Sequence, residues 1–278
     1  MTSDAAFAQR TFLAWPLRVA CLLAATWVIS GCAGTGAHAD RGSNADVVTE
    51  SDETPERKRA RIRMELALGY FEQGQTNVAL DELKQVIAGD PTYPQAYNLR
   101  GLIYMRLNDL RLADESFRRA VALAPKDGDT LHNYGWLMCQ QRRFDESFAT
   151  LQRAMENPTY GGRAKTLLAL GVCQARAGRT EDAERSLARA YELDAANPVT
   201  GFNLARLLYQ RGELTRAQFY IRRLNNSEFA NAETLWLGVK VERRVGDRVA
   251  MNQLADQLRK RYAQSPEAAA FAKGAFDE

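Results

Sequence analysis

The sequence has few cysteines, histidines, glycines and prolines, and no large excess of charge of either sign. Four cysteines and two histidines in 278 residues are too few and too scattered for a disulfide framework, and no spacing between them matches a zinc site. Only 19 glycines and 8 prolines exclude collagen-like and low-complexity chains. The balance of 37 basic against 34 acidic residues argues against nucleic acid as a partner held by electrostatics alone.

Sequence motifs for catalysis are also missing. The chain contains no phosphate-binding loop, dinucleotide glycine fingerprint, paired-histidine metal motif or serine elbow. We therefore expect no enzymatic activity, no cofactor, no metal site and no small-molecule substrate. One alternative is a hydrolase or enzyme accessory in which His132 acts with a nearby acid, but no nucleophile lies at a suitable spacing from it.

No apolar run in the N-terminal region is long enough to span a membrane. Residues 19–29 are apolar except for Thr26 and follow Arg10 and Arg18, whereas a transmembrane helix needs roughly 20 apolar residues. A basic region before a short apolar core is typical of a secretory signal, which we assign to residues 1–31. The alternative is an ordinary signal that is cleaved elsewhere, with Cys32 incidental.

The four residues at the end of this core, Ile-Ser-Gly-Cys at positions 29–32, resemble the bacterial lipobox. The resemblance implies that Cys32 carries a covalent lipid, and lipid chains of this kind hold a protein permanently at a membrane. Ala33 rather than Asp follows Cys32, which by the same resemblance implies the periplasmic face of the outer membrane.

Residues 32–59 are predicted to form the lipidated cysteine and a flexible tether. Apart from Val47 and Val48 they contain almost no large apolar side chain and are rich in Gly, Ser, Thr, Asp and Glu. Such a composition cannot bury a hydrophobic core.

The remaining chain repeats itself every 34 residues. A small residue recurs at 67, 101 and 135, and a turn-type position recurs at 74, 108 and 142, before two extra residues near 161–162 shift the phase. This pattern resembles the tetratricopeptide repeat. The resemblance implies an all-α, right-handed superhelical solenoid of about six repeats over residues 60–264, with a C-terminal capping helix over residues 265–278.

Each repeat has the features of a helical hairpin. The small residue at the eighth place allows two helices to approach closely, the glycine near the fifteenth place ends the first helix in a left-handed conformation, and a proline near the thirty-second place stops the second helix. One hairpin cannot bury its apolar face alone, so stacked hairpins share the core and the first helices line a concave surface.

The concave surface is the candidate binding site. In this type of repeat the second, fifth, ninth, twelfth and thirteenth places face the groove, and here many of them are apolar, which suits an amphipathic helix or strand of a partner. The Lys and Asn clamp of chaperone-binding repeats is missing from the matching places. The alternative is that some of these apolar side chains, such as Trp136 and Val172, pack against neighbouring helices. The predicted partner-binding residues are Met64, Leu68, Phe71, Leu102, Met105, His132 and Trp136.

Cys139 and Cys173 fall on the first helices of adjacent repeats. Packed helices lie about 8–10 Å apart, which exceeds the ~4.4–6.8 Å between α-carbons in a disulfide. We therefore expect free thiols that behave as small apolar side chains. The alternative is a disulfide between them, formed in the oxidising periplasm.

The lipobox, the short acidic tether and the six repeats together resemble the type IV pilus biogenesis lipoproteins of the PilF/PilW kind, as do the stretches LALGYFEQGQTNVALDELKQVI and HNYGWLMCQQRRFDES. The resemblance implies a pilotin, which binds the pilus secretin, localises it to the outer membrane and promotes its multimerisation. The alternative is a generic periplasmic scaffold lipoprotein for cell-envelope assembly or cell-wall enzymes.

Overall fold

A computed structural model describes residues 53–276, which contain thirteen α-helices and no strand. The signal sequence, Cys32 and most of the predicted tether therefore lie outside the described residues. The helices are α1 (Pro55–Glu72), α2 (Thr76–Gly89), α3 (Pro94–Arg106), α4 (Leu110–Leu123), α5 (Gly128–Gln140), α6 (Phe144–Glu156), α7 (Arg163–Arg176), α8 (Thr180–Leu193), α9 (Pro198–Gln210), α10 (Leu214–Asn225), α11 (Ala232–Val245), α12 (Arg248–Arg261) and α13 (Pro266–Lys273). None of them is both long and apolar enough to cross a membrane.

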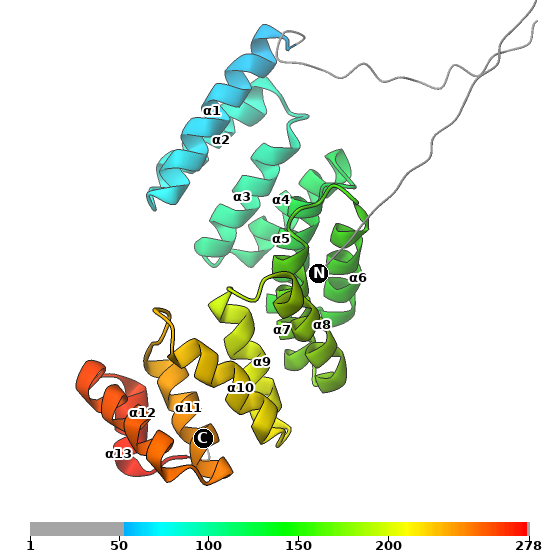
Figure 1. Ribbon diagram of the computed structural model, residues 1–278. Helices are drawn as coiled ribbons and strands as arrows, with labels where there is room; N and C mark the ends of the chain where they lie inside the picture. The colour runs from blue at the N-terminus through cyan, green and yellow to red at the C-terminus, as the bar shows by residue number, and fades with distance from the viewer. Residues whose placement is uncertain (1–52, 277–278) are drawn as a thin grey trace, which may run out of the picture. The chain divides into compact units, whose positions relative to one another are not determined.

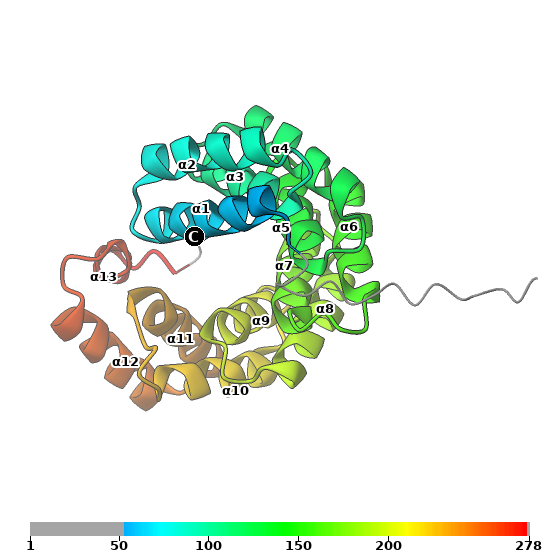
Figure 2. The same ribbon diagram turned by 90° about the horizontal axis from the view of Figure 1, so that it is seen from above.

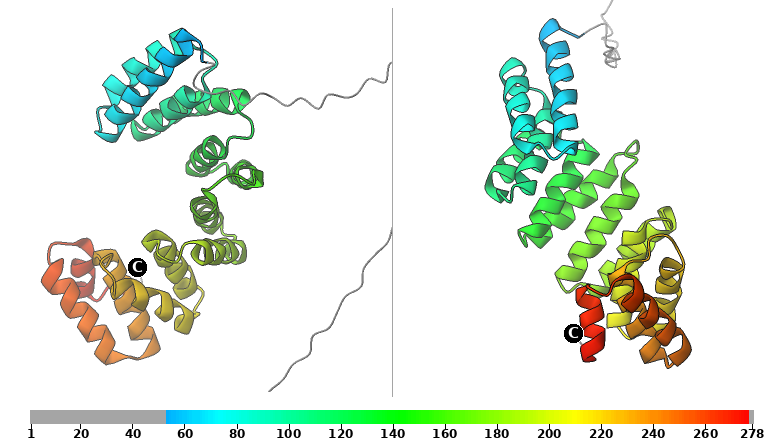
Figure 3. Two further views of the ribbon diagram at one scale, coloured as in Figure 1. Left: turned by 45° about the horizontal axis from the view of Figure 1, so that its top comes forward. Right: turned by 90° about the vertical axis from the view of Figure 1, so that its left-hand side faces the viewer.

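Consecutive helices pair into six antiparallel hairpins that are stacked along the chain (Figure 1). The odd-numbered helices α1 to α11 lie along the inner side of the stack, and the even-numbered helices lie outside them (Figure 2). Two further views show the same order of hairpins, with α13 packed at the end (Figure 3). The predicted all-α solenoid is confirmed.

The turn inside each hairpin depends on one residue in the left-handed conformation. These residues recur at the fifteenth place of every repeat and are Gly74, Asn108, Arg142, Gly178, Gly212 and Gly246, with φ between 59° and 92°. Glycine takes this conformation without steric cost, whereas a residue with a Cβ is strained there. The predicted left-handed end of each first helix is therefore present even where glycine is replaced.

The eighth place of the repeat sets the distance between the two helices of a hairpin. A Cβ added at Gly101 would lie 2.7 Å from the Phe117 ring, and one added at Gly135 would lie 2.7 Å from Leu151 Cγ. Phe117 and Leu151 are themselves fully buried. The absent glycine side chain thus makes room for the large core residue of the second helix.

The first helix begins earlier than the sequence predicts. Residues 55–59 were assigned to the tether, but α1 starts at Pro55, whose fixed φ suits the first helical position. The Thr54 side chain accepts a hydrogen bond from the Arg57 main chain, and the Arg57 side chain forms an ion pair with Asp90. Capping and this ion pair stabilise a helical turn whose composition alone indicates a tether.

The last hairpin is covered by α13. The Ser265 side chain caps this helix, and Pro266 is its first residue. The rings of Phe271 and Phe276 pack on Trp236, with centroids 6.3 Å and 5.3 Å from the indole. α13 and the residues that follow it thus cover an apolar surface of α11.

Candidate functional site

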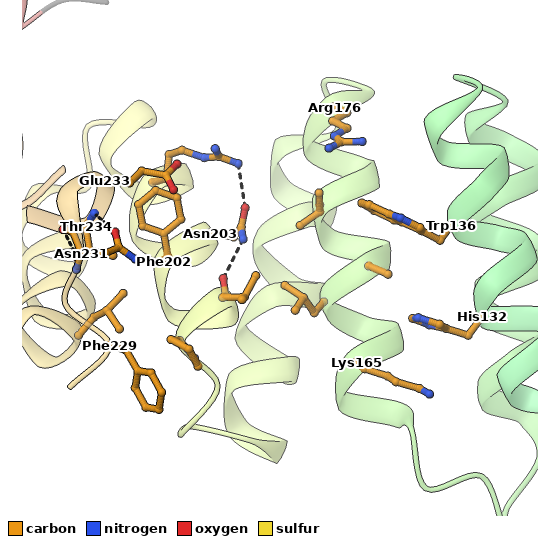
Figure 4. Close-up of a pocket in the computed structure, with 17 residues that line it drawn as sticks. His132, Trp136, Lys165, Arg176, Phe202, Asn203, Phe229, Asn231, Glu233 and Thr234 are labelled. Carbon is orange, nitrogen blue, oxygen red and sulfur yellow. Dashed lines mark hydrogen bonds between the residues drawn. The ribbon is translucent and has the colours of Figure 1, made fainter. Parts of the chain in front are cut away.

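A pocket of about 680 Å³ opens on the inner side of the stack between α5, α7, α9 and the start of α11. Trp136 and His132 project from α5 toward the helix that carries Lys165 and Arg176, and Phe202 lies on the opposite side (Figure 4). This volume falls in the range of pockets that enclose a ligand group or a segment of a partner protein.

The repeat places these side chains in register. Lys165, Val199 and Glu233 are second places of successive repeats, separated by 34 residues each, and all three line the pocket. Along α7, Lys165 and Arg176 lie three helical turns apart on one face. Second, fifth, ninth and thirteenth places of these repeats therefore line the pocket, whereas Cys139 at a twelfth place is buried.

The floor of the pocket is apolar. Leu168 and Val172 of α7 are partly buried and pack against the core of the neighbouring hairpins, and Ala169 is buried. Phe202 rises from α9. An apolar side chain of a partner would move out of water when it packs against these groups. This burial is favourable by about 25 cal/mol for each Å² of apolar surface.

A disulfide lies beneath this floor and corrects the prediction of free thiols. Cys139 of α5 and Cys173 of α7 are bonded, with their α-carbons 5.8 Å apart. The prediction used the distance between helix axes, but each α-carbon lies ~2.3 Å from its axis. Two α-carbons on facing sides are therefore several ångströms closer than the axes, within the range of a disulfide.

His132 is held in a hydrogen-bonded position at the side of the pocket. Its Nδ1 lies 2.9 Å from Thr166 Oγ1, and the Tyr160 hydroxyl lies 2.8 Å from the same oxygen. Burial, with the nearby Lys165 charge, lowers the pKa of His132 to about 4. The imidazole is therefore neutral at pH 7, and it offers a partner a polar but uncharged contact.

Cations stand beside the aromatic side chains of the pocket. The Arg176 guanidinium lies 5.2 Å from the Trp136 ring, and the Arg206 guanidinium lies 5.5 Å from the Phe202 ring. Both distances allow a cation–π interaction. Lys165 forms an ion pair with Asp129 at 2.5 Å. The pocket thus combines an apolar floor with a basic rim.

A second pocket of about 550 Å³ continues along the same inner side toward the end of the stack. It shares Phe202, Arg206 and Glu233 with the first pocket. Its wall also carries Lys240, 5.4 Å from the Trp236 ring, and Arg244, 5.0 Å from the Tyr209 ring. Basic and aromatic side chains therefore continue through the last repeats.

Of the seven predicted partner-binding residues, the structure brings only His132 and Trp136 to the first pocket. The others lie on α1 and α3. Met64 and Phe71 pack against the core of the first repeats, and Leu102 and Met105 against the next core cluster. Leu68 remains 44% exposed.

The predicted strip on α1 and α3 is less apolar than its sequence indicates. The Arg106 guanidinium lies 3.9 Å from the Phe71 ring and donates a hydrogen bond of 2.7 Å to the Phe71 carbonyl oxygen. This cation covers one face of the ring. A partner role for these residues stays a prediction.

The sequence reasoning missed several residues of the pocket. Lys165, Phe202 and Arg176 occupy second, fifth and thirteenth places, which the repeat pattern predicts to face the groove, but they are not among the predicted partner-binding residues. Phe229 comes from the connection between α10 and α11 and had no such signal. In residues 53–276 no group of three or more His, Cys, Asp or Glu side chains is arranged to hold a metal ion.

Comparison with known proteins agrees with the geometry. A family model described as "TPR repeat" matches residues 68–108, and models described as "Tetratricopeptide repeat" match residues 94–127, 139–198 and 174–234. The stacked helical hairpins and these matches define a tetratricopeptide-repeat protein, to which class the chain belongs.

Within that class the chain is homologous to type IV pilus biogenesis proteins. It is 26% identical to the type IV pilus assembly protein PilF of Pseudomonas aeruginosa over 79% of this chain and 90% of that protein. The crystal structure of PilW, a type IV pilus biogenesis factor, superposes with a TM-score of 0.73 at 28% identity, covering 77% of this chain and 98% of PilW. A Pseudomonas aeruginosa PilF structure gives 0.72 at 24% identity, covering 80% of this chain and all of that one.

Proposed function

We propose that the chain is a pilotin: an outer-membrane lipoprotein adaptor that binds the type IV pilus secretin and promotes its outer-membrane localisation and multimerisation. The observation that carries the proposal is the similarity to PilF, which extends over 79% of this chain and 90% of that protein. The secretin partner is proposed from the resemblance of residues 32–278 to this family, and the lipid from the lipobox at Cys32.

The repeat array suits an adaptor because its binding surface is formed before the partner arrives. Helix–helix packing within each hairpin and the Cys139–Cys173 bond between neighbouring repeats fix the spacing of α5 and α7. A surface that needs no ordering on binding loses less conformational entropy. In this proposal the lipid on Cys32 holds the surface at the membrane, and the inner side of the stack holds a secretin segment.

The proposed contact for the secretin runs along α1, α3 and α5 and includes the seven predicted residues. Leu68 offers the sharpest test, because it is 44% exposed, whereas Leu66 on the same helix is 48% exposed and is not a groove place. We expect Leu68→Glu to abolish secretin multimers and Leu66→Glu to leave them unchanged. Truncation of a central aromatic anchor costs about 2 kcal/mol or more, roughly a thirtyfold loss of affinity, so Phe71→Ala should act like Leu68→Glu.

Secretin multimers are measured by gel electrophoresis of membranes without boiling, and the helical circular dichroism signal of each purified variant checks folding. Wild-type multimers in both Leu68→Glu and Phe71→Ala cells would refute the α1–α3 contact. Loss in Tyr209→Ala cells instead would move the contact to the later repeats.

The anchor is tested separately. Cys32→Ala should move the chain from the outer-membrane fraction to the soluble periplasmic fraction and remove palmitate labelling. A variant that still sediments with the outer membrane and still takes up label would contradict lipidation at Cys32.

A further inference from the structure

The two inner pockets form one channel. They share Phe202, Arg206 and Glu233, so the walls of the first continue directly into the second. Four inner helices from α5 to α11 border this channel, and at a spacing of about 8–10 Å between packed helices it extends over roughly 24–30 Å. An extended peptide of about seven to nine residues covers that length.

The arginines of the channel lack carboxylate partners within residues 53–276. Arg176 makes no hydrogen bond or ion pair there, and its guanidinium lies 5.2 Å from the Trp136 ring. Arg206 donates one hydrogen bond of 2.8 Å to the Asn203 amide oxygen, and Arg244 donates one of 3.4 Å to the Tyr209 carbonyl oxygen. Most of the donors of these three guanidinium groups are therefore available to a ligand.

Two arginines on the outer helices provide a contrast, because each is paired with a carboxylate. Arg189 pairs with Glu192 at 2.6 Å on α8, and Arg216 of α10 pairs with Glu184 at 2.6 Å. The chain as a whole carries a net charge of only +3. The positive charge of the channel is thus a local feature and does not follow from the overall charge of the protein.

The balance within the channel is also basic. Its cationic side chains are Lys165, Arg176, Arg206, Lys240 and Arg244, and its acidic side chains are Glu233 and Glu267. Burial lowers the pKa of Lys240, which indicates that a charge at this position is only partly solvated. A carboxylate brought into the channel would form charge-assisted hydrogen bonds with Arg176, Arg206 and Arg244.

We propose that this channel binds an extended protein segment in which acidic side chains alternate with bulky apolar ones. In an extended segment, alternate side chains point to opposite sides, so apolar groups reach the floor at Leu168, Val172 and Phe202 while carboxylates reach the arginines. The channel is distinct from the strip on α1 and α3, and the inference goes beyond the adaptor role because it holds for any partner that carries such a segment.

The test is a fluorescence anisotropy titration of the purified full chain with two labelled synthetic peptides. One alternates Glu or Asp with Phe or Leu, and the other replaces each acid by its amide. Because charge-assisted hydrogen bonds are roughly twice as strong as neutral ones, we expect the acidic peptide to bind about tenfold more tightly or better, and this advantage to shrink at high salt.

Variants locate the binding site. Arg176→Gln and Arg206→Gln should each weaken the acidic peptide by about tenfold and hardly change the amide peptide, because each removes one charge partner. Arg176→Lys keeps the charge and should retain most of the binding. Arg189→Gln, on the outer helix α8, is the matched control and should change neither peptide. Thermal melts followed by circular dichroism verify that all variants are folded.

Any one of the following results would overturn the inference: equal affinity for the two peptides, unchanged acidic-peptide binding in the Arg176→Gln/Arg206→Gln double variant, or tighter binding of a single-stranded oligonucleotide than of the acidic peptide. An acidic peptide without apolar residues that binds equally well would also contradict it. The assay contains no secretin, so peptide binding in it would support the inference even if the adaptor role were disproved.

Discussion

Replacement of Gly171 by alanine tests the packing logic of the repeat most sharply. Gly171 lies on α7, and an added Cβ would be 2.7 Å from Leu187 Cγ and 3.1 Å from the Ala183 carbonyl oxygen of α8. The side chain of Leu187 is fully buried and the carbonyl belongs to the backbone, so neither has room to move away. Gly69 of α1 is the matched control, since an added Cβ there has no neighbour within 4 Å.

The two substitutions should have opposite effects on stability. At Gly69, alanine removes the helix-propensity penalty of glycine, a gain of about 0.5–1 kcal/mol in the free energy of unfolding. At Gly171 the same gain is offset by overpacking, which costs about 1–3 kcal/mol. The expected net result is a loss of up to about 2.5 kcal/mol for Gly171→Ala, and a larger loss for Gly171→Leu.

Urea unfolding of the purified chain, followed by circular dichroism, measures both free energies of unfolding. The slope of the free energy with urea must stay constant, because a change in slope would indicate a change in the denatured state or a loss of two-state unfolding. Equal shifts of the urea midpoint in Gly69→Ala and Gly171→Ala would refute the reasoning that the eighth place controls helix approach.

Three further predictions concern single features of the repeats. Arg142→Gly should stabilise the chain by about 0.5–1 kcal/mol in urea unfolding, because Arg142 occupies the left-handed region at φ 62°; a loss of stability would contradict this. Cys139→Ser with Cys173→Ser should lower the free energy of unfolding by roughly 3–4 kcal/mol, as the bond closes a loop with a sequence separation of 34; equal stability of the double variant and the oxidised chain would refute it. Between pH 6.5 and about 4, His132 binds a proton in the unfolded chain but not in the folded chain. The free energy of unfolding should therefore decrease by up to about 3 kcal/mol as the pH is lowered through this range. Urea titrations at several pH values should show that His132→Gln removes this part of the pH dependence.

Much of the fold follows from the repeat pattern because each repeat encodes its hairpin locally. The left-handed position at Gly74 and the close helix approach at Gly101 are visible from spacing alone, and both are present. The same logic identifies the inner face, since the second and fifth places at Lys165 and Phe202 line the pocket.

Features that depend on how hairpins meet were harder to predict. The Cys139–Cys173 bond requires facing α-carbons, and their separation depends on the packing of α5 against α7 rather than on either repeat alone. Phe229 reaches the pocket from a connection between helices, where no repeat place fixes its direction. The helical start at Pro55 is stabilised by a contact of Arg57 with Asp90, 33 residues away.

The central claim is that the inner side of the stack holds a secretin segment, and site-specific photocrosslinking tests it directly. A photoreactive phenylalanine analogue replaces Leu68 of the proposed α1–α3 contact, which is 44% exposed, or Phe219 of the outer helix α10, which is 60% exposed. Both positions tolerate a large side chain because they are solvent-exposed. The account predicts that the secretin is crosslinked in cells from position 68 and not from position 219; crosslinking from position 219 alone, or from neither, would contradict it.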